Sequence, residues 1–159
     1  MTLLLLAGLL TCSGLLGSYL WADLRKHTMI RARAIGEALH QYADKHDDAA
    51  MPAGPQWRQT LVDAQLLAAI YTTSPRAWRH KPESFCYVPG WTRKLVQEQR
   101  IDPDQHILVF ENPASTHADE LFVFTWDGAV RELPRDELLR RLATTRTGDG
   151  TLVTWEGMK

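Results

Sequence analysis

Apolar and small residues fill the first 22 positions of the chain, MTLLLLAGLLTCSGLLGSYLWA, without a single charged side chain. At a helical rise of about 1.5 Å per residue the segment spans roughly 33 Å, which matches a bilayer core of about 30 Å. Because lipid offers the backbone no hydrogen-bond partners, a lone spanning segment has to be helical. The pattern predicts a transmembrane helix at residues 1–22, ended by the polar run that starts at Asp23.

Two other interpretations of this segment are open but less favoured. A cleaved signal peptide has a basic start and a small-residue cleavage site, whereas here nothing basic precedes the apolar run and SYLWAD is a poor site. A lipoprotein signal would lipidate Cys12, but Thr11 stands where a smaller residue is usual. Cys12 is therefore interpreted as an inert thiol within the span.

The predicted span carries two further sets of residues. Glycines let another membrane helix approach closely, and the three candidates for a helix–helix contact are Gly8, Gly14 and Gly17. Aromatic and basic residues gather where a span meets the headgroups, and the predicted interface residues are Tyr19, Trp21, Arg25 and Lys26. The lipid bilayer and other membrane subunits are thus the first expected partners.

The helical pattern continues beyond the span, with no proline before Pro52. Apolar residues recur at helical spacing, and the stripe consists of Ala32, Ile35, Leu39 and Tyr42. This predicts one long helix from the membrane to residue 46, packed against a domain. A second, shorter helix is expected from Pro55 on, with an inner face of Trp57, Leu61, Ala64 and Leu67.

The second half of the chain has the pattern of short strands and turns that predicts an antiparallel sheet over residues 84–133. Runs rich in β-branched and aromatic residues predict strands at 84–88, 106–110, 120–126 and 129–133. Asp127 and Gly128 separate the last two strands, and an Asp-Gly pair there predicts a type I′ hairpin with positive φ at both residues. A short helix with a loop is expected within residues 91–104, a closing helix at 135–144 and a polar tail at 145–159.

These elements predict an α+β fold, in which residues 23–144 form one domain on a membrane stalk. Its first part is the long amphipathic helix 23–46, and its second part is the small antiparallel sheet with the closing helix. The 18 basic and 19 acidic residues balance, so the chain has no overall basic field for nucleic acid. Cys12 lies in the predicted span and Cys86 in the soluble part of the chain. The two thiols are therefore not expected to meet, and no internal disulfide framework is predicted.

Candidate chemistry is sparse. The sequence contains no Gly-x-Ser-x-Gly, no phosphate-binding glycine loop and no His-Glu-x-x-His. His117, Asp119 and Glu120 bring three metal-ligand types into one loop without a second cluster. Cys86 near His80 could be a thiol nucleophile, but a cysteine within an apolar strand is by default buried and inert. We expect that the protein has no enzymatic activity and binds no cofactor.

The order of the elements resembles type IV pilins and pseudopilins, most closely the planctomycete and verrucomicrobial pseudopilin-like proteins with a C-terminal Asp-Gly hairpin. The resemblance covers roughly residues 30–140 and is carried by AIGEALHQYADKHDDAAMP (34–52), Trp57 and Leu61, SFCYVPG (84–90), LVFENP (108–113) and FVFTWDGAVREL (122–133). It implies a pilin-like domain with no catalytic role.

Two features depart from that family. Its processing signature, a basic leader with Gly before Phe-Thr-Leu-Ile-Glu, is absent, and the span contains no glutamate. Ala129 also stands where the family usually has a histidine after Asp-Gly. These departures put leader-peptidase processing and ordinary filament assembly in doubt.

The resemblance implies a bacterial inner-membrane protein with a periplasmic domain, whereas the basic residues after the span favour the cytoplasmic side by the positive-inside rule. We favour the periplasm, because pilins often carry basic residues there. The expected function is that of a minor structural subunit in a type II secretion or pilus-type assembly, with contacts through the N-terminal helix and the sheet face. The alternative is an accessory subunit of another membrane complex; a membrane-anchored enzyme is less favoured.

Overall fold

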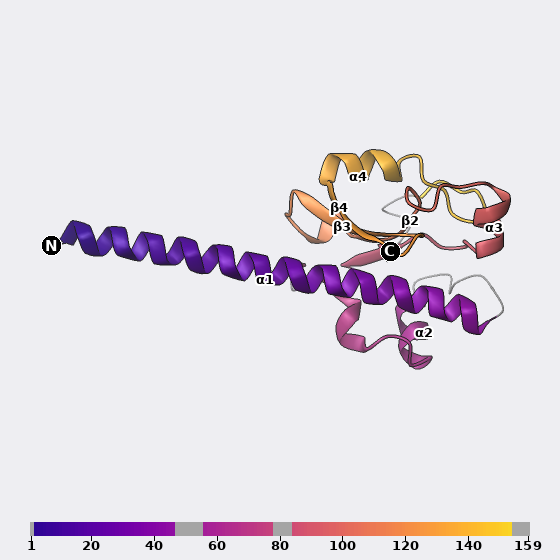
Figure 1. Cartoon of the computed structure of the whole chain (residues 1–159), viewed down its shortest axis with the longest axis horizontal. Coiled ribbons are helices and arrows are strands. Elements are labelled where there is room, and N and C mark those ends of the chain that lie inside the picture. The colour runs from indigo at the N-terminus through magenta and orange to yellow at the C-terminus, as the bar shows by residue number, and fades with distance from the viewer. Residues whose placement is uncertain (1, 47–55, 78–83, 154–159) are drawn as a thin grey trace.

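One helix dominates the computed structural model, which describes residues 2–46, 56–77 and 84–153, with side chains from residue 17 on. Helix α1 (Thr2–Lys45) is 44 residues long and has no break. Its C-terminal half lies along the domain and its N-terminal half projects away from it (Figure 1). The prediction of one long helix running to about residue 46 is confirmed.

Among the described residues, no helix has both the length and the apolar character that crossing a membrane requires. The predicted span at residues 1–22 depends mostly on residues 1–16, whose side chains lie outside the described part.

The four strands form one antiparallel sheet in the order of the chain: β1 (Phe85–Tyr87), β2 (Ile107–Glu111), β3 (Glu120–Thr125) and β4 (Val130–Pro134). β-branched and aromatic residues fill β2 and β3, which are buried along nearly their whole length. All four predicted strands are present, and each end lies within one residue of its predicted position. The α+β fold class is confirmed at this level.

Helices cover both faces of the sheet (Figure 1). On one face α1 and α2 (Trp57–Asp63) enclose a core with Ile35, Leu39, Leu61, Phe85 and Phe124. On the other face, α3 (Arg93–Glu98) and α4 (Arg135–Leu142) enclose a core with Val96, Phe110, Leu121, Val123 and Leu138. Neighbouring residues of β3 thus point into different cores, as the alternation of a strand requires.

Shorter elements complete the domain. The 3-10 turns η1 (Ala69–Thr72) and η2 (Pro113–Ser115) lie in the connections before β1 and β3. On the predicted inner face of α2, Trp57, Leu61 and Leu67 are buried and Ala64 is half-buried. Pro55 lies outside the described residues. In the tail, Arg146 pairs with Leu152 and Val153 enters the second core.

The β3–β4 hairpin exists, but its predicted type I′ turn is wrong. Gly128 has a φ of +86°, whereas Asp127 is not among the residues with positive φ. The N–H of Gly128 donates to the Thr125 carbonyl (3.0 Å), and the N–H of Thr125 donates to the Ala129 carbonyl (3.0 Å). This is a three-residue loop that ends in a left-handed glycine.

Asp127 contributes its side chain to this turn instead of an unusual backbone angle. Its carboxylate accepts hydrogen bonds from the Thr125 hydroxyl (2.6 Å) and the Ala129 N–H (3.1 Å), and it pairs with Arg131 (2.9 Å). The hydrogen bond from Arg131 is the main reason that the pKa of Asp127 is lowered to about 2. Both predicted turn residues therefore shape the hairpin, for different physical reasons.

We expect Gly36→Ala to destabilise the domain by about 1–2 kcal/mol, because a Cβ at residue 36 would overlap the ring of Phe124. Alanine by itself favours a helix over glycine by about 1 kcal/mol. The control is Gly17→Ala in the same helix, where nothing lies within 4 Å of the added Cβ. Urea unfolding followed by tryptophan fluorescence measures both; an unchanged or increased stability of Gly36→Ala would contradict the close packing.

Replacing Gly128 by valine should cost about 1–2 kcal/mol, since a β-branched residue is strained at a φ of +86°. The space around Gly128 is open, so a steric clash with neighbours is not the cause. Asparagine tolerates positive φ, so the matched variant Gly128→Asn should lose less stability. Thermal unfolding checks the order, and equal melting temperatures for all three chains would refute the left-handed turn.

Candidate functional site

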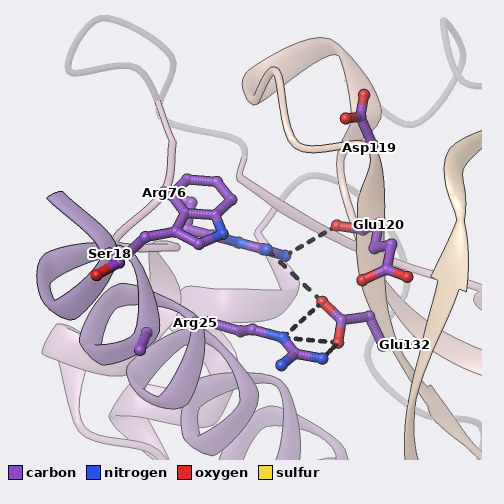
Figure 2. A pocket seen from close by; sticks show the side chains of 8 residues that line it. Ser18, Arg25, Arg76, Asp119, Glu120 and Glu132 are labelled. Atoms are coloured by element: carbon purple, nitrogen blue, oxygen red, sulfur yellow. Dashed lines mark hydrogen bonds and ion pairs between the residues drawn. The ribbon is translucent and has the colours of Figure 1, made fainter. Parts of the chain in front are cut away.

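A pocket of about 500 Å³ opens where α1 leaves the domain (Figure 2). Helix α1, the connection after η1, and the start of β3 together with β4 build its wall. The lining residues are Ser18, Trp21, Ala22, Arg25, Arg76, Asp119, Glu120 and Glu132. Sequence segments more than 100 residues apart thus meet at the point where the helix projects.

Arg76 is the buried centre of this junction. Its side chain is 1% exposed and forms an ion pair with Glu111, whose side chain is 0% exposed. The guanidinium also donates to the carbonyl of Glu120 (3.2 Å) and lies 3.8 Å from the Glu132 carboxylate. The Phe122 ring stacks beneath it, with the guanidinium carbon 4.8 Å from the ring centroid. Arg76 therefore connects β2, β3 and β4.

The buried carboxylate of Glu111 has further hydrogen-bond donors. It accepts from the Ser74 hydroxyl (2.8 Å) and, at 3.4 Å, from the N–H of Phe122. The N–H of Ser74 donates to the Ser84 hydroxyl (2.5 Å), and the Ser74 hydroxyl lies 3.4 Å from that of Thr28 on α1. Because moving two charges out of water costs several kcal/mol per ion, such a pair is tolerated only when its remaining polar atoms are satisfied.

A second ion pair joins α1 to the sheet directly. The Nε of Arg25 donates to both carboxylate oxygens of Glu132, at 3.0 and 2.8 Å, and Nη2 donates to the same carboxylate. The Arg25 side chain is 53% exposed, and Glu132 is 13% exposed. Hydrogen bonding to Glu132 raises the pKa of Arg25. One turn earlier on the helix, the Trp21 ring lies over Arg76, with its centroid 5.6 Å from the guanidinium carbon.

The charges of this pocket do not balance. Three carboxylates and two guanidiniums belong to its lining, which therefore carries a net charge of −1. Within the described part of the chain, the carboxylates of Asp119 and Glu120 form no ion pair. Figure 2 shows Glu120 beside Glu132, across the pocket from α1.

A groove of about 380 Å³ continues from this pocket along α1. It shares Ala22, Arg25 and Glu132 with the pocket. Its other lining residues are Lys26 and the apolar residues Met29, Phe122 and Val130. The surface at the junction is thus charged toward the projecting end of α1 and apolar toward the domain.

Two histidines form a separate cluster with tryptophans at the other end of the sheet. The ring of His40 on α1 lies 5.2 Å from that of Trp126, and the ring of His106 lies 4.4 Å from that of Trp91. Trp126 packs against both cores and so bridges the two layers. In the described structure the Nε2 atoms of both histidines are buried without a hydrogen-bond partner.

Burial lowers the pKa of His106 to about 4. Burial, assisted by the positive charge of Arg93, also lowers the pKa of His40. Both imidazoles are therefore neutral at pH 7 and pack as aromatic rings. No group of three histidine, cysteine or acidic side chains that could hold a metal ion occurs among the described residues.

The residues predicted from sequence have different surroundings in the structure. Tyr19 and Trp21 are exposed, at 75% and 49%, while Arg25 is bound to Glu132. Gly17 has open space around it, and Gly8 and Gly14 have side-chain positions outside the described part. Lys26 lines the groove beside Arg25.

The other chemistry-bearing candidates do not meet. Cys86 is buried in β1, and His80 lies outside the described residues. Asp119 and Glu120 line the pocket, but His117 is not among its lining residues.

The sequence analysis did not identify Arg76, Glu111 or Glu132 as residues of this site. Glu111 carried a usable signal, because it follows four apolar residues in a strand that is buried throughout. A charged residue in that position needs a buried partner. Nothing in the sequence around Arg76 identifies it as that partner, since the two are 35 residues apart.

Comparisons of the chain with protein-family models, with curated proteins and with solved structures produced no match.

We expect Arg76→Met to destabilise the domain by about 3–5 kcal/mol, because it leaves the Glu111 carboxylate buried without its counter-charge. Arg33→Met is the matched control, since Arg33 belongs to an exposed pair with Glu37 (3.9 Å) and should cost under about 1 kcal/mol.

The double variant Arg76→Met/Glu111→Leu removes both charges and should recover part of the loss. Chemical denaturation of the four chains measures these differences. A single variant Arg76→Met that is as stable as the control would show that the buried pair has no counter-charge requirement.

Acid should weaken the fold between pH 6.5 and about 4. Unfolded histidine binds a proton below about 6.5, whereas His106 in the folded chain does so only below about 4. In that interval the unfolded state holds more protons, so stability falls as the pH falls, by up to about 1.4 kcal/mol per pH unit. His40 adds to the loss in the same direction. Asp127 acts only below about 3.8.

The free energy of unfolding as a function of pH checks this, with His106→Gln as the non-titrating variant. Its slope between pH 6.5 and 4 should be smaller than that of the unaltered chain, whatever its absolute stability. Identical slopes would contradict a buried neutral imidazole.

Proposed function

We propose that the chain is a membrane-anchored, non-enzymatic protein with a pilin-like domain, which acts through contacts with other membrane subunits. The observation that carries the proposal is α1: one unbroken helix of 44 residues supplies both a projecting N-terminal half and a layer of the domain core. At about 1.5 Å per residue it is roughly 66 Å long. A stalk that continues into a core helix, covered by an antiparallel sheet, is the arrangement expected for pilin-like proteins.

The change in side-chain exposure along α1 supports an anchor role. From Thr28 to Ala43 one side of the helix is buried against the domain, while residues 17–23 are exposed. The exposed part includes three large apolar or aromatic side chains in a row, Tyr19, Leu20 and Trp21. The uncharged sequence of residues 1–22 continues this surface. Such a segment is stable in lipid and is costly to leave in water.

The junction supports a binding role instead of a catalytic one. Arg76 and Arg25 are each bound to a carboxylate. These groups hold α1 and the sheet together. In the proposed function they fix the direction of the anchor relative to the domain.

An accessory subunit of another membrane complex is the second candidate. Two observations favour it over a pilus-type or type II secretion subunit: the span contains no glutamate, and both broad faces of the sheet are covered. A contact through the sheet face, as the sequence suggested, has no open face among the described residues. The proposed contacts are therefore the projecting helix and the groove beside it.

The proposal is tested by protease accessibility of a C-terminal epitope tag on the full chain in spheroplasts. We expect the chain to stay with membranes after carbonate washing, because residues 1–22 span the bilayer. We also expect digestion from outside, because the proposal puts the domain in the periplasm. A cytoplasmic marker protein that resists digestion confirms intact spheroplasts.

Two results would overturn different parts. Release of the chain from membranes by carbonate would contradict the proposed membrane anchor. Protection of the tag until lysis would place the domain in the cytoplasm, in line with the basic residues that follow the span, and would remove the periplasmic secretion or pilus role.

A further inference from the structure

We propose that the free edge of β4 binds an extended segment of a partner protein, which adds a strand to the sheet and places an apolar side chain in the groove beside α1. The inference rests on the proposed function, because it names the kind of contact by which the domain binds another membrane subunit.

The backbone of β4 carries the first step. β4 lies at the end of the strand order, with β3 as its neighbour among the described residues. The N–H of Thr125 donates to the Ala129 carbonyl, so this pair is a hydrogen-bonded pair of the β3–β4 ladder. Every second pair of an antiparallel ladder is bonded in this way, so the N–H and C=O groups of Val130 and Glu132 point away from β3. Within the described part of the chain these groups have no hydrogen-bond partner, which makes them a template for another strand.

The groove carries the second step, because the same two residues line it. Its volume is about 380 Å³, and its apolar surface comes from Met29 on α1 and from Phe122 and Val130 on the sheet. Side chains of an added strand alternate between the two faces of the sheet, so every second one points to the side of α1. One of them then lies over the groove while its backbone bonds to β4. A free edge beside a side-chain pocket is what recognition by strand addition requires.

Glu132 does not block this edge, although an inward-pointing charge often protects the edge of a sheet. Its carboxylate accepts two hydrogen bonds from Arg25 Nε and lies 3.8 Å from Arg76, so its charge is met within the domain. Pro134 has no N–H and ends the free edge. The segment that binds is therefore short.

Lys26 gives the groove a positive rim. It lines the groove, is exposed, and forms no ion pair with the described residues, whereas its neighbour Arg25 is paired with Glu132. An acidic residue in the partner segment would complement this charge. The expected segment therefore combines a large apolar residue with β-branched neighbours and a carboxylate.

A second copy of the chain does not suit this edge. Antiparallel pairing of β4 with itself requires a two-fold axis perpendicular to the sheet. That axis reverses every direction in the plane of the sheet, so the two α1 helices, which lie along the domain, would project in opposite directions (Figure 1). Two anchors in one bilayer have to project toward the same membrane. The proposed occupant is therefore a segment of a different protein.

The test selects peptides from a phage-displayed library of random heptapeptides on the full chain in nanodiscs, after depletion on empty nanodiscs. We expect the enriched peptides to share a large apolar residue, β-branched neighbours and an acidic residue. A synthetic copy of such a peptide should slow the amide hydrogen exchange of Val130 and Glu132, because their N–H groups become hydrogen-bonded.

The variant Val130→Pro removes an outward N–H without removing a bond of the β3–β4 ladder, and we expect it to bind the peptide about tenfold more weakly. The matched variant Val130→Ala also shortens the apolar side chain but keeps the N–H, so it should bind more tightly than Val130→Pro. A peptide that is methylated at the backbone nitrogen facing β4 tests the same hydrogen bonding on the unaltered chain and should lose affinity.

The charge of the rim is tested by Lys26→Glu, which should weaken acidic peptides about threefold. Lys45→Glu makes the same change in charge at the other end of α1, outside the groove, and should leave the affinity unchanged.

Equal binding to Val130→Pro and Val130→Ala, together with full affinity of the methylated peptide, would overturn the edge site, as would a library from which no peptide is enriched. A dimer of the full chain that dissociates in Val130→Pro would assign the edge to a second copy and overturn the partner. These results leave the anchor intact. A chain that stays outside the nanodiscs overturns the proposed function and this inference together.

Discussion

The contact between α1 and the sheet is the constraint on which the rest of the structure depends. Gly36 lies against the ring of Phe124 so closely that no side chain fits between them, and Ile35 and Leu39 fill the core on either side. This contact fixes the helix on the sheet along its C-terminal half. Because α1 has no break, the same contact also fixes the direction in which the N-terminal half leaves the domain.

Charged groups reinforce that contact at the point where the helix emerges. The buried pair of Arg76 and Glu111 lies under the sheet side of the junction, and Arg25 and Glu132 close it on the outside. A buried pair adds little net stability, because its desolvation offsets most of the attraction. It does penalise any arrangement that separates the charges, so it specifies how helix and sheet meet. The apolar core stabilises the domain, and the ion pairs determine how α1 is aligned on the sheet where the helix leaves the domain.

Anchor, junction and pocket form one physical unit in this view. In the proposed function the apolar segment places residues 18–25 at the membrane surface; the structure shows that the ion pair of Arg25 with Glu132 holds the domain against that part of the helix. Under the proposed function this fixed geometry would let the docking surfaces meet a partner in one orientation.

The sequence by itself determined the elements. Helical periodicity and the absence of proline predicted α1 to its end, and β-branched runs predicted all four strands, because both signals are local. Asp127 and Gly128 located the hairpin, but its turn type depended on where the strands stop pairing. Only the tertiary structure decided that helices cover both faces of the sheet and that Arg76 meets Glu111 across 35 residues. Charge pairing over such a separation leaves no periodic pattern, since it arises from the fold that brings the two residues together.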